Sequence, residues 1–286
     1  MQNIKNILVP GYGGREMAVD ICYDPAKTHQ PVVIYAHGFN GFKDWGNFDL
    51  IATKVAAAGF VFIKFNFSHN GTTLAMPTEF EDLEAFGQNN YSIELYDLNA
   101  IIDWVVNPLN KYLDRMDIQK LSLIGHSMGG GIAILQAATD KRITKLVTWS
   151  TINECNTPWG SWPIEKLQEW KKKGVQYYTN SRTHQQMPMY YQLYEDYLAN
   201  SEKLDILKAI STLHIPILLC HGTLDEAVPI EKAVELQKWQ PAARLFTVES
   251  DHVYGRRHPW TENYLPPIME SVVEETIHFF QEGNRK

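Results

Sequence analysis

Apolar residues along the chain are spaced so that strand-like and helix-like segments alternate. Continuously apolar runs are typical of strands buried on both faces, and they lie at 31–36, 60–65, 121–124, 143–149, 215–220 and 243–248. Helical spacing of apolar residues predicts helices over 44–58, 93–106, 128–138, 231–239 and 268–280. This alternation favours right-handed crossovers and therefore an α/β fold, with a mostly parallel, doubly wound sheet covered by helices on both faces. Within residues 1–23 the stretch 16–23 instead has a period near two and no helix after it, which predicts an antiparallel hairpin at the sheet edge.

The segment 153–211 interrupts this alternation. It contains no convincing strand but many Trp and Tyr residues, and it is far longer than a connection between a strand and a helix requires. We interpret it as a helical cap insertion over the carboxyl edge of the sheet, where open α/β sheets bind ligands. Its aromatic residues could equally serve only to pack the insertion. Since no repeat or Ser/Gly-rich linker divides the chain, we expect one domain over 1–286 with this cap within it.

Composition and charge exclude several classes of partner. The chain has 286 residues, with 26 Lys plus Arg against 33 Asp plus Glu, a formal net charge of −7. An acidic chain without a basic run is a poor ligand for nucleic acid or an anionic membrane surface. Its apolar runs are much shorter than the roughly 20 residues that span a bilayer, and early Pro and Gly residues argue against a secretory signal. Three widely spaced cysteines, without a CxxC motif, favour a reducing cytoplasm over a disulfide framework or a zinc site.

The sequence Gly125-His-Ser127-Met-Gly129 is the strongest chemical signal. This G-x-S-x-G pattern follows an apolar strand and precedes an apolar helix, which is the strand–turn–helix setting in which a serine nucleophile is exposed. A turn this tight leaves no room for side chains at Gly125 and Gly129. Ser127 as a simple helix cap would explain the serine but not the paired glycines.

A nucleophilic serine needs a base and a carboxylate that orients the base. Asp225 and His252 follow two later strands, in the chain order that a strand–elbow–helix nucleophile requires. We therefore expect Ser127 to attack a carbonyl, His252 to transfer the proton and Asp225 to fix the imidazole tautomer. The competing acids are Glu226 and Asp251, and the competing bases are His221 and His258.

An oxyanion hole requires two main-chain N–H donors. We expect one from Met128, the residue after the nucleophile, and the other from Phe39, which follows Gly38 in the loop after the first central strand. The side chain of Phe39 is also a candidate wall of the substrate pocket. Ser68 and His69 follow the next strand and are further candidates for substrate binding, although a polar surface loop explains them equally well. The polar stretch 180–188 could line an acyl pocket or only cap helices of the insertion.

Together these motifs resemble the α/β-hydrolase superfamily. Those that carry the resemblance are HGF at 37–39, GHSMGGG at 125–131, HGTLDEAVP at 221–229 and the loop of His252. Within the superfamily the chain is similar to serine esterases of the cinnamoyl/feruloyl-esterase and dienelactone-hydrolase-like kind, over about 25–150 and 212–282. It departs from dienelactone hydrolases in having a serine where their nucleophile is cysteine, and it lacks an HGGG-type loop. The resemblance implies two-step acyl transfer through an acyl-enzyme on Ser127, without a metal or cofactor.

Three functions follow from these residues. The first is hydrolysis of a small or medium carboxylic ester, in which the acyl group is an aromatic one if the cap lines the pocket. The second is a serine aminopeptidase or amidase, for which Glu154, Glu165 or Arg182 could anchor a charged terminus. The third is a ligand-binding protein of the same fold with little turnover. The sequence gives no oligomeric state.

Overall fold

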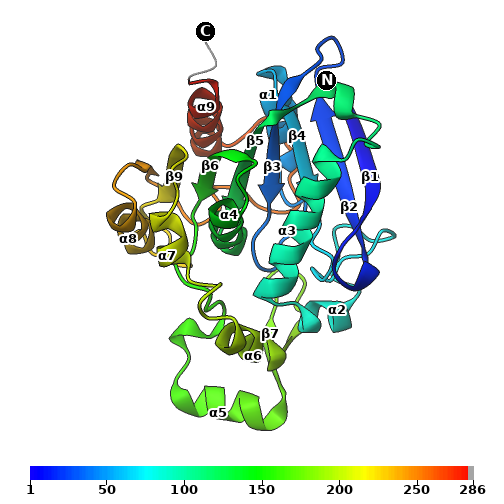
Figure 1. Ribbon diagram of the computed structural model, residues 1–286. Coiled ribbons are helices and arrows are strands. Elements are labelled where there is room, and N and C mark those ends of the chain that lie inside the picture. The colour runs from blue at the N-terminus through cyan, green and yellow to red at the C-terminus, as the bar shows by residue number, and fades with distance from the viewer. Residues whose placement is uncertain (283–286) are drawn as a thin grey trace.

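The computed structural model describes residues 1–282 and contains an eight-stranded, mostly parallel sheet (Figure 1). Across the sheet the order is β1-β2-β4-β3-β5-β6-β9-β10. β1 pairs antiparallel with β2 and β2 with β4, whereas the pairs from β4 to β10 are parallel. The bounds are β1 Gln2–Pro10, β2 Glu16–Tyr23, β3 Gln30–Ala36, β4 Val61–Phe65, β5 Met116–His126, β6 Ile143–Trp149, β9 Ile217–Gly222 and β10 Arg244–Val248. The predicted parallel sheet and its antiparallel edge hairpin are confirmed.

Helices cover both faces of the sheet, and each face has its own apolar core. One face is covered by α1 (Phe48–Ala57) and α9 (Pro267–Gln281); the other by α3 (Tyr91–Val106), α4 (Met128–Thr139), α7 (Ile206–Ser211) and α8 (Glu231–Trp239). Side chains of β3 alternate between these cores: Val32 and Ile34 pack on the α3–α4 side, Val33 and Tyr35 on the α1–α9 side. Burial on both faces is why the run 31–36 is continuously apolar.

The insertion at 153–211 is only partly helical, so the prediction of a helical cap was wrong in this respect. It contains a 3-10 turn (η3, Trp159–Ser161), α5 (Ile164–Lys173) and α6 (Gln192–Ala199), but also an antiparallel hairpin of β7 (Val175–Thr179) and β8 (Gln186–Tyr190). Each strand is five residues long. Pro188 lies inside β8, where proline argues against a strand on sequence grounds. A two-stranded hairpin tolerates it because both strands have a free edge.

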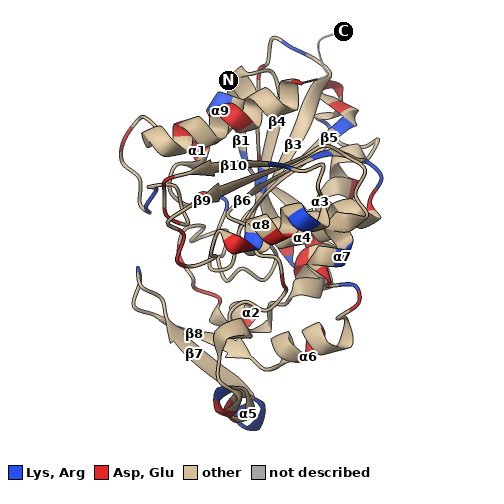
Figure 2. Cartoon of the chain, turned by 90° about the vertical axis from the view of Figure 1, so that its left-hand side faces the viewer, with Lys and Arg blue, Asp and Glu red and all other residues tan. Residues whose placement is uncertain are grey.

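The cap lies beyond the end of the sheet at which the parallel strands finish, at the bottom of Figure 1. Figure 2 shows the hairpin running from α5 back toward the sheet, and β8 packs against α2 (Leu83–Gln88), a helix that the apolar pattern did not predict. α7 is not part of the cap, because it packs against α4 and α8. We expected one domain over residues 1–286, and the last four of these, 283–286, lie outside the described residues.

Candidate active site

Ser127 occupies a strained turn between β5 and α4. Its φ and ψ of 54° and −121° lie in a region that non-glycine residues rarely adopt, and such strain is concentrated at functional sites. A Cβ on Gly125 would lie 2.3 Å from the main-chain oxygen of Gly129, and one on Gly129 would lie 2.2 Å from that of His37. Both glycines are therefore required, because any side chain would drive the turn into its neighbours.

Asp225 and His252 are brought together from the loops after β9 and β10. Asp225 Oδ2 accepts a hydrogen bond from His252 Nδ1 at 2.8 Å, and Oδ1 accepts from the N–H groups of Ala227 (3.0 Å) and Val228 (2.8 Å). Burial on its own would raise the pKa of Asp225, but hydrogen bonds from His221 and His252 hold that pKa well below its usual value. The ionised carboxylate fixes the proton of His252 on Nδ1 and leaves Nε2 free to accept another.

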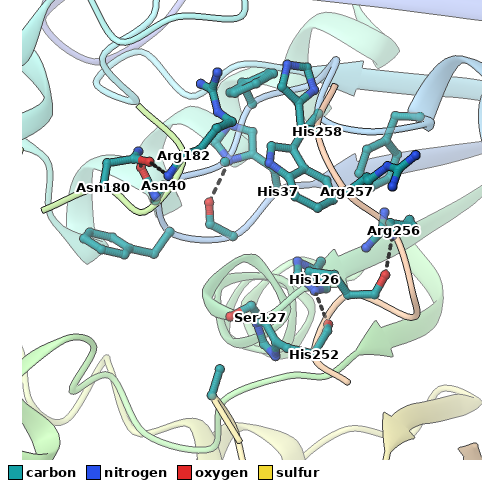
Figure 3. Close-up of a pocket in the computed structure, with 18 of the residues that line it drawn as sticks. His37, Asn40, His126, Ser127, Asn180, Arg182, His252, Arg256, Arg257 and His258 are labelled. Carbon is teal, nitrogen blue, oxygen red and sulfur yellow. Dashed lines mark hydrogen bonds between the residues drawn. The ribbon is translucent and has the colours of Figure 1, made fainter. Parts of the chain in front are cut away.

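Ser127 and His252 line the same pocket (Figure 3). Within residues 1–282 the structure contains no hydrogen bond between Ser127 Oγ and His252 Nε2. Rotation about the single side-chain torsion of Ser127 moves its hydroxyl between three positions. Catalytic hydrogen bonds are often long before substrate binds, so the absence of this bond does not argue against the pair.

The competing acids are placed differently from Asp225. Glu226 is exposed, and Asp251, also exposed, uses Oδ1 to accept the main-chain N–H of Gly255 at 2.9 Å, which closes a turn of its own loop. Neither forms a hydrogen bond with an imidazole in the described chain. Asp225 is therefore the acid that orients His252.

The competing bases are also committed to other contacts. His221 is fully buried and donates from Nε2 to the main-chain oxygen of Val228 at 2.8 Å. His258 does line the pocket, but its Nδ1 accepts the N–H of Gly46 at 2.9 Å. His252 is the histidine that combines a carboxylate partner with access to the pocket.

The main-chain N–H groups of Met128 and Phe39 have no acceptor in the described chain. Met128 is the first residue of α4, so its N–H has no intrahelical partner. Phe39 follows β3, and its N–H donates to no group in the described chain. Gly38 lies against the nucleophile, since a Cβ there would be 2.9 Å from Ser127 Cβ. The N–H groups of Phe39 and Met128 thus remain the candidates for an oxyanion hole.

His37 is a structural element of the same loop. It is buried, its Nδ1 donates to the main-chain oxygen of Gly38 at 3.0 Å, and its Nε2 accepts the N–H of Phe67 at 3.3 Å. Burial lowers the pKa of His37 to about 4, against a smaller opposing effect of the Gly38 hydrogen bond. A neutral imidazole thus holds the turn that carries Phe39.

Sequence reasoning missed His126, although it lies inside the serine motif. His126 Nε2 donates to the main-chain oxygen of His252 at 3.0 Å, and the two rings are 4.8 Å apart. Burial, assisted by the neighbouring His252, holds the pKa of His126 well below its usual value. The motif leaves this position variable, so nothing in the pattern marked it.

The pocket has a volume of about 560 Å³ and is lined by both the sheet edge and the cap. From the cap come Asn180, Ser181 and Arg182, and Asn180 Nδ2 donates to Asn40 Oδ1 at 3.0 Å. The stretch 180–188 therefore lines the pocket with its first residues and continues into β8, rather than capping helices. Aromatic side chains make much of the remaining wall: Tyr35, Phe39, Phe42, Trp45, Phe48 and Phe80.

Ser68 and His69 lie elsewhere, which corrects their assignment to substrate binding. Neither lines the pocket of Ser127. The N–H of Ser68 donates to Asp97 Oδ2 at 2.7 Å, and the ring of His69 packs against Tyr12. Asp97 also accepts the N–H of Tyr12 at 2.7 Å, so this buried carboxylate draws the chain after β4 toward the β1–β2 edge and away from Ser127.

One cluster of carboxylates has the spacing of a metal site, but ammonium groups neutralise it. Oxygens of Asp20, Asp44 and Asp49 lie within 4.8 Å of one another. Lys43 Nζ is 2.8 Å from Asp20 and 2.6 Å from Asp44, and Lys64 Nζ is 2.6 Å from Asp49. These ion pairs of two buried lysines anchor the loop after β3, and the carboxylate cluster does not suit a further cation.

A match to a protein-family model assigns the chain to a family. The BD-FAE model matches residues 19–240, which is most of the sequence and includes Ser127 and Asp225. The chain belongs to the BD-FAE family. His252 lies outside the matched segment, and so does α9.

Solved structures show that the chain has the α/β-hydrolase fold. Est1E from Butyrivibrio proteoclasticus with ferulic acid bound is 17% identical, with a TM-score of 0.68 over 98% of this chain and 100% of that one. A hydrolase from Agrobacterium vitis is 18% identical, with a TM-score of 0.71 over 98% of each chain. The helices of residues 1–282 include none with the length and apolar character needed to cross a membrane.

A curated relative matches over a shorter stretch. The quorum-quenching protein AidA of Acinetobacter baumannii is 24% identical over 118 residues, 41% of this chain and 34% of AidA. The match thus spans about a third of that relative.

Proposed function

We propose that this BD-FAE family member is a serine esterase that hydrolyses a carboxylic ester through an acyl-enzyme intermediate on Ser127. The observation that carries the proposal is the 2.8 Å hydrogen bond between His252 Nδ1 and Asp225 Oδ2, made at the edge of the pocket that Ser127 lines. A carboxylate–imidazole pair beside a strained serine is the arrangement that acyl transfer requires.

In the first step Ser127 Oγ attacks the ester carbonyl while His252 Nε2 accepts the hydroxyl proton. The carbonyl oxygen becomes negatively charged and is stabilised by the N–H groups of Phe39 and Met128. His252, held as an imidazolium by Asp225, then protonates the departing alkoxide. The C–O bond to the alcohol breaks, the alcohol leaves, and the acyl group remains on Ser127.

In the second step water replaces the alcohol. His252 Nε2 takes a proton from water as the oxygen attacks the acyl carbon, and the same two N–H groups stabilise the second oxyanion. Collapse of this intermediate breaks the bond to Ser127 Oγ, which recovers its proton from His252. The products are a carboxylic acid and an alcohol.

The acyl group that we propose is small or medium and includes aromatic acids. Support comes from the aromatic wall of the pocket, in which Phe39 packs against Phe86 and Tyr178 from β7. Est1E, a protein of the same fold, has been solved with ferulic acid bound.

An aminopeptidase is less well supported. A free amino terminus is recognised by carboxylates, yet no Asp or Glu of residues 1–282 lines the pocket. Glu154 bonds to Asn156 on the surface, and Glu165 lies in the first turn of α5. Arg182 lines the pocket, but it is paired with Glu79 at 3.2 Å.

We also propose that the chain works in the cytoplasm, as a single domain with its cap. Cys22, Cys155 and Cys220 are free and buried, as in proteins of reducing compartments. The pocket is formed jointly by the cap and the sheet edge, so the two parts are expected to act as one unit.

The test is turnover of a panel of 4-nitrophenyl and methyl esters, with matched amides, by wild type and Ser127→Ala. We expect wild type to cleave aromatic and short-chain esters faster than the amides, and Ser127→Ala to lose roughly 10⁴-fold or more in kcat. Tight binding of these ligands without turnover would instead support the low-turnover binding protein.

A further inference from the structure

Arg256 is a buried arginine whose charge is paired with no carboxylate in the described chain. Only 4% of the residue is exposed, and its Nε donates to the main-chain oxygen of Val253 at 2.8 Å. The two terminal nitrogens, Nη1 and Nη2, are buried and donate no hydrogen bond in the described chain. The guanidinium lies 4.9 Å from the ring of Phe48 and 5.5 Å from that of Trp45. Burying an unpaired charge is costly, so such a group is normally retained for a partner.

Arg256 belongs to the pocket of Ser127. It lines the pocket with Phe48 and Trp45, and Figure 3 shows it on the side of His126 and His252, across from Arg182. The segment 256–258, which follows the loop of His252, contributes three consecutive lining residues. A group bound at Arg256 therefore shares one cavity with the reacting serine.

The charge of the whole pocket has one sign. The charged side chains that line it are the arginines Arg182, Arg256 and Arg257, and none of the lining residues in the described chain is Asp or Glu. Arg182 is paired with Glu79, whereas Arg256 keeps its full charge for the cavity. This polarity contrasts with the net charge of −7 of the chain.

We propose that Arg256 binds a carboxylate of the substrate, so that the preferred ester carries a second, free carboxylate besides the bond that is cleaved. The two unpaired nitrogens form the planar fork that matches a carboxylate bidentately. The rings of Trp45 and Phe48 lie beside the guanidinium, and an ion pair is stronger in such apolar surroundings than in water. This inference rests on the proposed esterase activity and specifies its substrate class.

The test compares esters that differ by one carboxylate. 4-Nitrophenyl hydrogen adipate and 4-nitrophenyl hexanoate have the same chain length, and the hydrogen pimelate and suberate esters extend the reach. We expect wild type to have a kcat/KM at least about 10-fold higher for the best anionic ester than for its neutral counterpart. Preference for the neutral ester at every length would overturn the proposal.

Arg256→Met removes the charge and keeps most of the apolar stem. We expect the anionic-to-neutral ratio of kcat/KM to fall about 10- to 100-fold, the usual effect of losing a charge-assisted hydrogen-bond pair. A ratio measured within one variant is unaffected by partial misfolding. The matched control is Arg15→Met, an exposed arginine that does not line this pocket, for which we expect the ratio to stay within about threefold. An unchanged ratio in Arg256→Met contradicts the proposal.

Calorimetric binding of adipate separates this proposal from the proposed function. If no ester is cleaved, the esterase assignment has failed, and adipate binding to wild type that weakens at least 10-fold in Arg256→Met still supports the anion site. If esters are cleaved but adipate binds equally to both proteins, the esterase assignment stands and the anion site is wrong.

Discussion

His126 Nε2 donates a hydrogen bond to the main-chain oxygen of His252 at 3.0 Å, and the two imidazole rings lie 4.8 Å apart. His126 immediately precedes Ser127, so this bond ties the loop after β10 to the turn after β5. The N–H must be the donor, because a carbonyl oxygen only accepts. The relative position of the proposed base and nucleophile thus depends on a residue that takes no part in proton transfer.

Replacing His126 should therefore misplace His252. We expect His126→Ala to lower kcat by about 10- to 100-fold, since displacements near 1 Å have effects of that size. His126→Gln, whose amide can donate to the same oxygen, should recover part of the loss. Steady-state kinetics of the two variants would contradict this positioning role if they were equally impaired or both unimpaired.

Asp225→Asn should be far more damaging. An amide in place of the carboxylate can donate to Nδ1 and place the imidazole proton on Nε2, where it blocks proton transfer; in serine proteases the corresponding change costs about 10⁴-fold in kcat. Glu226→Gln is the matched control, because Glu226 is the adjacent acid and is exposed. Equal losses in the two variants would show that the effect is not specific to Asp225.

Gly38→Ala tests the contact between the loop after β3 and the nucleophile. The added Cβ would lie 2.9 Å from Ser127 Cβ and 3.0 Å from the main-chain oxygen of His126, so one of them must shift. We expect kcat to fall about 10-fold or more with the fold retained, measured by ester turnover and circular dichroism. Gly174→Ala, with φ of +75° and nothing within 4 Å, should cost about 1 kcal/mol of stability and leave kcat unchanged.

Most of the sheet and the proposed triad could be predicted from the sequence because the signals there are local. Strands buried on both faces give continuous apolar runs, and Ser127, Asp225 and His252 each follow such a run. Because the carboxyl ends of parallel strands lie at one edge of the sheet, the loops that follow them are expected to meet in one site.

Other features depend on tertiary contacts that no local pattern reports. The hairpin of β7 and β8 is short and contains Pro188. Ser68 and His69 follow a strand, as the site residues do, but Asp97 from α3 holds that loop at another edge. Arg256 could not be singled out from the sequence, because its burial beside Trp45 and Phe48 depends on tertiary contacts.

The stability of the protein should vary with pH above neutrality because of Glu94. Burial raises the pKa of this side chain to about 8, against the hydrogen bond from Asn89, which lowers it. The folded state therefore holds a proton that the unfolded state releases near pH 4.5, and the stabilisation from that proton is lost as pH rises toward 8. At 1.36 kcal/mol per pH unit, Glu94 lowers the free energy of unfolding by roughly 2 kcal/mol between pH 6.5 and 8.

Glu94→Gln removes this dependence while keeping an oxygen for Asn89. Urea unfolding at pH 6.5, 7.25 and 8 should show the free energy of unfolding of wild type declining by roughly 2 kcal/mol relative to that of the variant. Parallel pH profiles of the two proteins would contradict the assignment. Below pH 6.5 the variant should lose more stability than wild type. Unfolding lets His37 and His126, held neutral by burial, take up protons in both proteins, whereas Glu94 offsets part of that loss in wild type only.

Covalent labelling of the nucleophile tests the central claim most directly. Wild type, Ser127→Ala and Asp225→Asn are treated with a fluorophosphonate, digested and mapped by mass spectrometry, with ester turnover followed in parallel. We expect one adduct, on Ser127, whose appearance matches the loss of turnover, no adduct in Ser127→Ala and much slower labelling of Asp225→Asn. An adduct on another residue, or ester turnover that persists in Ser127→Ala, would contradict the account.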